Sequence, residues 1–162
     1  MAIIDFAGLS AQLGRDGKLA ALDLGTRTIG VAASDLRRML ASPVGVIRRT
    51  KLAPDLVALD AMLAPHHPLA LVLGLPLNMD GTEGPRCQSV RQFATNLVNH
   101  APPALRELPL FLQDERLSTA AVTRGMIDDY DMTRARRAER VDAAAAAWIL
   151  ESTLQRLANA PP

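Results

Sequence analysis

The sequence predicts a mixed α/β domain, and three observations support this fold class. Two apolar runs, residues 19–24 and 29–33, are separated by a short polar turn that contains a glycine, which is typical of a β-hairpin. Residues 69–76 are apolar on both faces, as in an internal parallel strand. Segments with the apolar spacing of helices stand between and after these strands. We therefore expect a five-stranded mixed sheet with helices on both faces.

Two further strands complete the predicted sheet. Residues 42–47 follow the hairpin after a polar connection and suggest a third antiparallel strand. Residues 109–113 form the last strand and run directly into the acidic pair Asp114 and Glu115.

Helical spacing predicts the segments that cover the sheet. Residues 55–63 carry leucines on one face and end before two prolines, and residues 89–99 carry apolar side chains on one side. A helix capped by Ser118 or Thr119 is expected to run to about residue 127. Residues 128–134 are polar, and the final helix covers residues 136–157. The segment before the first strand is either a short helix packed on the domain or partly disordered.

The composition is that of a single soluble domain. The chain has 162 residues with a formal net charge of +1, which neither indicates nor excludes nucleic acid as a partner. We divide it into an N-terminal extension, residues 1–17, and one domain, residues 18–158. The lone Cys87 excludes an internal disulfide and suits the reducing cytoplasm. Without an apolar run of about 20 residues or a signal-peptide pattern, we expect a cytoplasmic protein.

A charged residue interrupts the first strand. Asp23 stands within an otherwise apolar run, and a buried carboxylate is costly unless a partner satisfies it. One interpretation is that Asp23 accepts nearby backbone N–H groups. The interpretation that we favour is a carboxylate that faces a metal ion or a phosphate, because Gly25 and Gly30 leave room for a ligand to approach the backbone.

Further acidic residues stand where other elements meet the sheet. Asp114 and Glu115 close the last strand, and Asp142 precedes a run of alanines that lets a helix lie close to the sheet. Asp142 could simply favour the helix dipole. Together, however, these carboxylates suggest a site for hard divalent cations such as Mg²⁺ or Mn²⁺. Two such ions can activate water and stabilise the leaving oxygen during phosphodiester hydrolysis.

Four motifs in the chain resemble those of the YqgF/RuvX family. They are LAALDLGTRTIGVA at 19–32, GLPLNMDGTEGP at 74–85, DERLST at 114–119 and RVDAAAAAWILESTL at 140–154. They occur in the family's order and cover about residues 18–157. The resemblance implies an RNase H-like fold, shared with Holliday junction resolvases of the RuvC type. It also implies a hydrolase that processes the 5′ end of precursor 16S rRNA during ribosome biogenesis.

The resemblance also assigns roles to the acidic residues. It implies that Asp23, Glu115 and Asp142 are the catalytic acids and metal ligands, although the motif itself leaves Asp114 open as the ligand in place of Glu115. Side chains alternate along a strand, so Asp114 and Glu115 point to opposite faces, and the longer Glu115 is better suited to reach Asp23. We expect Asp114 to accept N–H groups at the turn that follows the strand.

Arginines near these acids are candidates for contacts with the phosphate backbone. A solvated helix face is the alternative explanation for such a cluster. The predicted nucleic-acid-binding residues are Arg27, Arg116, Arg134, Arg136, Arg137 and Arg140. The loop at residues 78–85 could bind phosphates, cover the substrate or simply be solvated.

The sequence is compatible with several functions. Besides a nuclease acting on structured RNA in a pre-ribosomal particle, we consider a Holliday junction resolvase acting on branched DNA and a non-catalytic RNA-binding module. The DLGT turn also resembles the phosphate loop of actin-like ATPases, but those proteins need two related lobes around the nucleotide. We expect a monomer or a weak homodimer.

Overall fold

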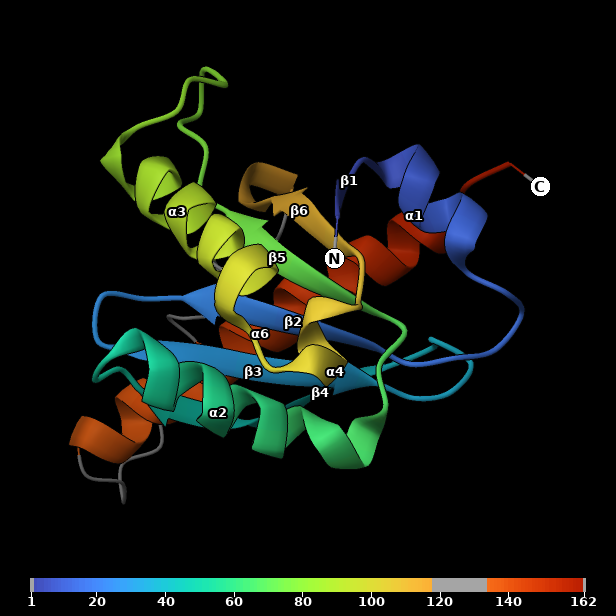
Figure 1. The fold of residues 1–162 in the computed structure, drawn as a ribbon. Helices are drawn as coiled ribbons and strands as arrows, with labels where there is room; N and C mark the ends of the chain where they lie inside the picture. Colours follow the sequence, from blue (N-terminus) through green and yellow to red (C-terminus); the bar gives the residue numbers. More distant parts are fainter. Residues whose placement is uncertain (1, 118–133, 162) are drawn as a thin grey trace.

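The computed structural model describes residues 2–117 and 134–161. Within this part of the chain, six strands form one sheet in the order β1-β6-β5-β2-β3-β4 (Figure 1). The strands are β1 (Ile3–Ile4), β2 (Leu19–Leu24), β3 (Thr28–Ser34), β4 (Ala41–Arg48), β5 (Ala70–Leu75) and β6 (Leu110–Asp114). β3 is antiparallel to β2 and β4, and the other neighbouring pairs are parallel. The predicted mixed sheet is confirmed.

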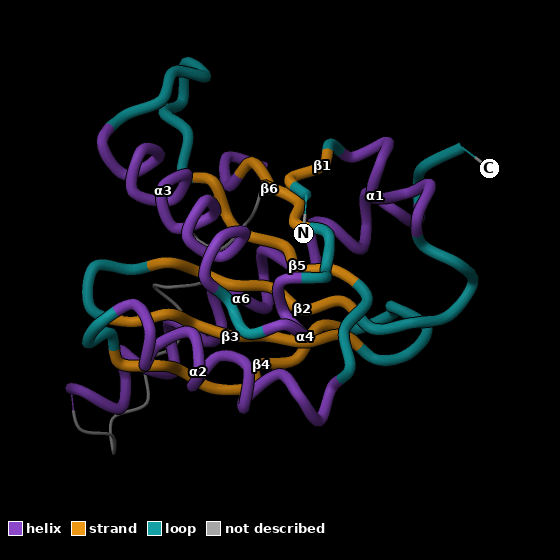
Figure 2. The backbone as a smooth tube through the Cα atoms, in the orientation of Figure 1, coloured by secondary structure: helices purple, strands orange, loops and turns teal. Residues whose placement is uncertain are grey.

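Helices cover both faces of this sheet. They are α1 (Phe6–Gln12), α2 (Leu52–Leu63), α3 (Pro85–His100), α4 (Pro103–Arg106) and α6 (Arg134–Ala158). Two 3₁₀ turns, Ala64–His66 and Glu115–Leu117, follow α2 and β6. In the view of Figure 1, α2, α3 and α4 lie in front of the sheet and α6 lies behind it. Figure 2 shows the strands between these two helical layers.

Each face of the sheet has its own aliphatic core. Leucines of β2 and β5 on the front face pack with α2 and α3, including Leu59 and Leu97. On the other face, small residues such as Ala21 and Ala32 pack with the α6 residues Ala146 and Leu150. Because adjacent strand residues face opposite sides, fully buried strands such as β2 and β5 are apolar at almost every position.

The structure differs from the sequence prediction at several boundaries. The sheet has a sixth strand, β1, which the sequence did not reveal because two residues show no periodicity. α3 begins at Pro85 rather than at residue 89, since proline is well tolerated in the first turn of a helix. The helix predicted from Ser118 or Thr119 to residue 127, and the polar stretch after it up to residue 133, lie outside the described residues.

The N-terminal segment packs against the domain. Asp5 caps α1 by accepting a hydrogen bond from the backbone N–H of Gly8 at 2.8 Å. The rings of Phe6 and Phe111 meet edge to face with centroids 5.9 Å apart, and the Arg156 guanidinium lies 4.0 Å from the centre of the Phe6 ring. Of the two alternatives for this segment, the packed helix is confirmed.

The backbone of α6 lies close against the sheet at Gly30. A Cβ atom built on Gly30 would lie 2.1 Å from the backbone oxygen of Asp142 and 3.2 Å from the nitrogen of Ala143. Only a residue without a side chain can stand there. The expectation that the alanine run brings Asp142 against the central strands is confirmed. None of the described helices is long and apolar enough to cross a membrane.

We predict that Gly30→Ala destabilises the protein by about 3 kcal/mol, because the added methyl group overlaps the backbone of α6. Chemical denaturation of the purified variant measures this loss. Gly45→Ala on the neighbouring strand β4 is the matched control, because its Cβ would meet only the flexible end of Met62, at 3.3 Å. Equal stability of the two variants would contradict the close approach of α6.

Candidate active site

Asp23 lies in the middle of the sheet between two glycines. It is 6% exposed and is paired with Gly30 on β3. On the other side, the register that pairs Leu22 with Leu73 makes Gly74 its neighbour on β5. Asp23 shares a face with Ala21, which packs in the α6 core, so its carboxylate points to the side of the sheet that α6 covers. The two glycines leave the space on either side of Asp23 free of sheet side chains.

Glu115 fills the space above Gly74. A Cβ atom on Gly74 would lie 2.4 Å from Oε1 of Glu115 and 2.6 Å from Cδ1 of Ile149 on α6. Gln113, two residues earlier, is buried on the same side, where it accepts a hydrogen bond from the Thr153 hydroxyl at 3.2 Å. The alternation of side chains along β6 thus continues through its end and places the Glu115 carboxylate on the face of Asp23.

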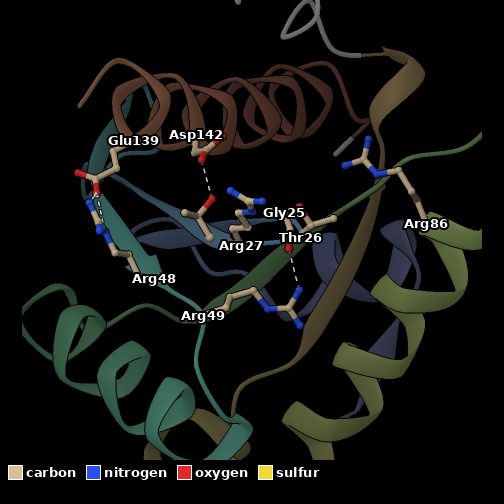
Figure 3. A pocket seen from close by; sticks show the side chains of 9 residues that line it. Gly25, Thr26, Arg27, Arg48, Arg49, Arg86, Glu139 and Asp142 are labelled. Atoms are coloured by element: carbon tan, nitrogen blue, oxygen red, sulfur yellow. Dashed lines mark hydrogen bonds and ion pairs between the residues drawn. The ribbon is translucent and has the colours of Figure 1, made fainter. Parts of the chain in front are cut away.

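Asp142 reaches the site from the other side, because its backbone lies over Gly30. Its Oδ2 accepts a hydrogen bond from the Thr28 hydroxyl at 2.5 Å. This bond joins α6 to β3 and directs the carboxylate to the end of the strand (Figure 3). Within residues 2–117 and 134–161, no three His, Cys, Asp or Glu side chains are arranged to hold a metal ion.

Asp114 forms an ion pair and hydrogen bonds with Arg116. Its carboxylate accepts hydrogen bonds from the backbone N–H of Arg116 at 2.9 Å and from Nη2 of the same residue at 2.8 Å. The Arg116 side chain holds the pKa of Asp114 below its usual value. The expectation that Asp114 accepts N–H groups at the turn is confirmed.

An open pocket of about 890 Å³ lies beside Asp142. It is lined by the β2–β3 turn, the end of β4, the start of α3 and α6 (Figure 3). Its lining residues are Gly25, Thr26, Arg27, Thr28, Arg48, Arg49, Arg86, Glu139 and Asp142. Arg48 forms an ion pair with Glu139 at 2.7 Å, and Nη1 of Arg49 donates to the carbonyl oxygen of Gly25 at 2.7 Å.

Of the other predicted arginines, those whose side chains the structure describes do not line this pocket. Arg136 and Arg140 line a separate pocket of about 360 Å³ over Gly45 and Val46 of β4. Arg116 is held by Asp114 and donates to the carbonyl oxygen of Met79 at 3.3 Å. Arg137 is half-buried on α6. Arg134 begins α6, and its side chain lies outside the described residues.

The sequence prediction did not assign Arg86 to the site. Arg86 stands in the first turn of α3, where a cation is unfavourable to the helix dipole. That unfavourable placement is the signal that could have identified it.

The loop before α3 forms hydrogen bonds within itself through several of its backbone groups. The N–H of Asn78 donates to the carbonyl oxygen of Thr82, and the N–H of Thr82 donates to the Asp80 carboxylate, each at 2.9 Å.

Comparison with known proteins identifies similar chains. The family model described as "RuvX: Holliday junction resolvase" matches residues 17–156. A protein of Phenylobacterium zucineum named "Putative pre-16S rRNA nuclease" is 52% identical over 160 residues, which cover 98% of this chain and 99% of that protein. A protein of the same name from Rhodospirillum rubrum is 56% identical over 141 residues, covering 87% of this chain and 84% of that protein.

A solved structure of T. thermophilus RuvC in complex with a Holliday junction substrate is also similar to this chain. It is 14% identical with a TM-score of 0.49, and the match covers 90% of this chain and 99% of that one.

We predict that Asp114→Asn lowers the free energy of unfolding by about 1 kcal/mol, because it weakens the bonds to Arg116 at a partly exposed site. Urea denaturation at neutral pH measures the change. Glu107→Gln, which neutralises an exposed carboxylate just after α4, should leave stability unaltered. If both variants unfold at the same urea concentration, the Asp114–Arg116 pair does not stabilise the turn.

Proposed function

Because the chain belongs to the RuvX family, we propose that it is a divalent-metal-dependent nuclease that processes the 5′ end of precursor 16S rRNA. The observation that carries this proposal is the environment of Asp23. Both of its neighbours in the sheet are glycines, and the positions that their Cβ atoms would fill are taken by the Asp142 backbone and the Glu115 carboxylate. Asp23, the Glu115 carboxylate and the Asp142 backbone, which come from three separate elements, therefore lie on one face of the sheet.

These acids suit a hard divalent cation in their chemistry. Mg²⁺ and Mn²⁺ prefer carboxylate oxygens, and Asp23, Glu115 and Asp142 supply them without a nitrogen or sulfur ligand. Among the described residues the three carboxylates are not arranged around one ion, so the Asp142 side chain, which accepts a hydrogen bond from Thr28, would have to turn towards Asp23 for all three to share a site. When bound, the ion would supply an activated water and would stabilise the leaving oxygen.

The rest of the chain positions the substrate at the acids. Gly25 and Thr26 have small side chains, or none, in the turn that lines the pocket, so a phosphate can approach the backbone there. The Thr28 hydroxyl orients the Asp142 carboxylate by donating a hydrogen bond to it. The guanidinium groups of the adjacent pocket offset the repulsion between the phosphate and the carboxylates. We assign residues 18–158 to this nuclease domain and expect it to work in the cytoplasm as a monomer or weak homodimer.

Cleavage of branched DNA is a second candidate function, which the description of the matching family favours. A labelled precursor rRNA 5′ fragment and a four-way DNA junction, each incubated with the protein and magnesium, separate the two. Cleavage of RNA alone supports the first function, and cleavage of the junction alone supports the second. A protein that binds RNA and cleaves neither would be a non-catalytic module.

We predict that Asp23→Asn and Glu115→Gln each abolish cleavage, while the melting temperature stays unchanged or rises because crowded carboxylates repel one another. Rates of RNA cleavage and thermal unfolding are measured together. Asp114→Asn and Glu107→Gln, the matched neutralisations outside the site, should retain substantial activity. A dead but fully stable Asp114→Asn beside an active Glu115→Gln would reverse the assignment of the ligand.

Metal binding has a readout independent of cleavage. Manganese should raise the melting temperature of the parent protein, because a ligand that binds only the folded state stabilises it. We expect the rise to be lost in Asp23→Asn and kept in Glu107→Gln. A rise of equal size in Asp23→Asn would place the ion elsewhere in the protein.

A further inference from the structure

Three arginines in the pocket beside Asp142 form no ion pair with a carboxylate in the part of the chain that the structure describes. Arg27 lies in the β2–β3 turn, Arg49 follows β4, and Arg86 lies in the first turn of α3 (Figure 3). Among the residues that the structure describes, none of the three forms an ion pair, whereas Arg48 in the same pocket is paired with Glu139. The hydrogen bond of Arg49 goes to a neutral carbonyl oxygen. The pocket is therefore strongly positive.

The start of α3 adds to this potential. Gly84 precedes the helix and provides no side-chain cap, so the positive end of the helix dipole is left to its surroundings. A positive side chain at this end weakens the helix, and Arg86 is therefore not explained by the stability of α3. A bound anion would satisfy both the helix terminus and the arginine.

A second pocket, of about 660 Å³, continues from the first at Arg49 and lies against α3 and the start of α2. Gln88, Gln92 and Asn96 of α3 line it with side-chain amides, and Nε2 of Gln92 donates to Oδ1 of Asn96 at 3.3 Å. Asp55 also lines it, but its carboxylate accepts bonds from the backbone N–H and the hydroxyl of Thr50. Besides Arg49 and the hydroxyl of Ser89, the polar side chains that line this pocket along α3 are amides, which can both donate and accept hydrogen bonds.

We propose that these two pockets form one path for a single-stranded segment of the RNA substrate. Backbone phosphates lie at Arg27, Arg49 and Arg86, and a base lies against the amides of Gln88, Gln92 and Asn96. The inference rests on the proposed nuclease function, since Asp142 at the edge of the first pocket relates this path to the acids.

The amides explain why the segment is single-stranded. Amide side chains recognise the hydrogen-bonding edges of bases, which unpaired nucleotides expose and which an RNA duplex hides in its deep, narrow groove. A pocket of several hundred Å³ can accept one unpaired nucleotide. A strand crossing the β2–β3 turn would run from the acids, past the arginines, to the amides.

Binding of a labelled single-stranded RNA, measured in EDTA at several salt concentrations, tests the path without cleavage. Arg86→Ala should weaken binding and reduce the log–log salt slope by about 0.7, the value for one phosphate contact on a single strand. Arg86→Lys should recover most of the slope. Arg37→Ala, which removes an exposed arginine at the β3–β4 connection, should change neither quantity. A parental slope in Arg86→Ala would overturn the phosphate assignment.

The amide pocket is tested by the double substitution Gln92→Ala and Asn96→Ala. It should weaken binding of single-stranded RNA several-fold without altering the salt slope, because the amides carry no charge. Binding of a fully paired RNA duplex should be unaffected, and Gln155→Ala on α6 serves as the control. Parental affinity of the double variant for the single strand would overturn the base pocket.

Because binding is measured without cleavage, the proposed path and the proposed nuclease function can fail separately. A parent protein that cleaves RNA while both sets of variants bind normally would disprove the path alone. A parent protein that shows the expected binding pattern and never cleaves would disprove the nuclease function alone.

Discussion

The contact between α6 and the sheet at Gly30 is the constraint on which the site depends. The position that a Gly30 side chain would occupy lies 2.1 Å from the Asp142 carbonyl oxygen, so the helix backbone rests directly on β3. Small residues on both surfaces, such as Ala32 and Ala146, belong to the core between this helix and the sheet. Because Gly30 is the partner of Asp23, the packing that fixes the helix also brings Asp142 to the acid of the central strand.

The periodicity of apolar residues was sufficient to predict most of the fold. Strands such as β5 and β4 were found within two residues of their observed ends, because burial on one or two faces leaves a clear pattern. Strand alternation also predicted that Asp114 and Glu115 face opposite ways, as they do. β1 escaped prediction, because its pairing with β6 depends on tertiary structure rather than on its two residues.

Sequence proximity was a poor guide to the arginines near Asp142. In an α-helix, residues three or four apart share a face, while residues two apart lie on nearly opposite sides. Asp142 therefore borders the large pocket, whereas Arg140, two residues earlier, lines another one over β4 together with Arg136, and Glu139 borders both pockets. The arginines that do border the large pocket, including Arg49 and Arg86, come from other elements, and only the fold brings them together.

The acids and the arginines around the site differ in burial and in the elements that carry them. Asp23 is buried within the sheet, while the pocket arginines project from turns and helix ends. In the proposed nuclease, pairing of the pocket arginines with carboxylates would weaken their attraction for phosphate. Asp114 shows the result of such pairing, since its bonds to Arg116 keep its carboxylate occupied and lower its pKa. Two adjacent acids at the end of β6 thus have different surroundings, because the strand turns Asp114 towards Arg116 and Glu115 towards Gly74, on the face of the sheet that carries Asp23.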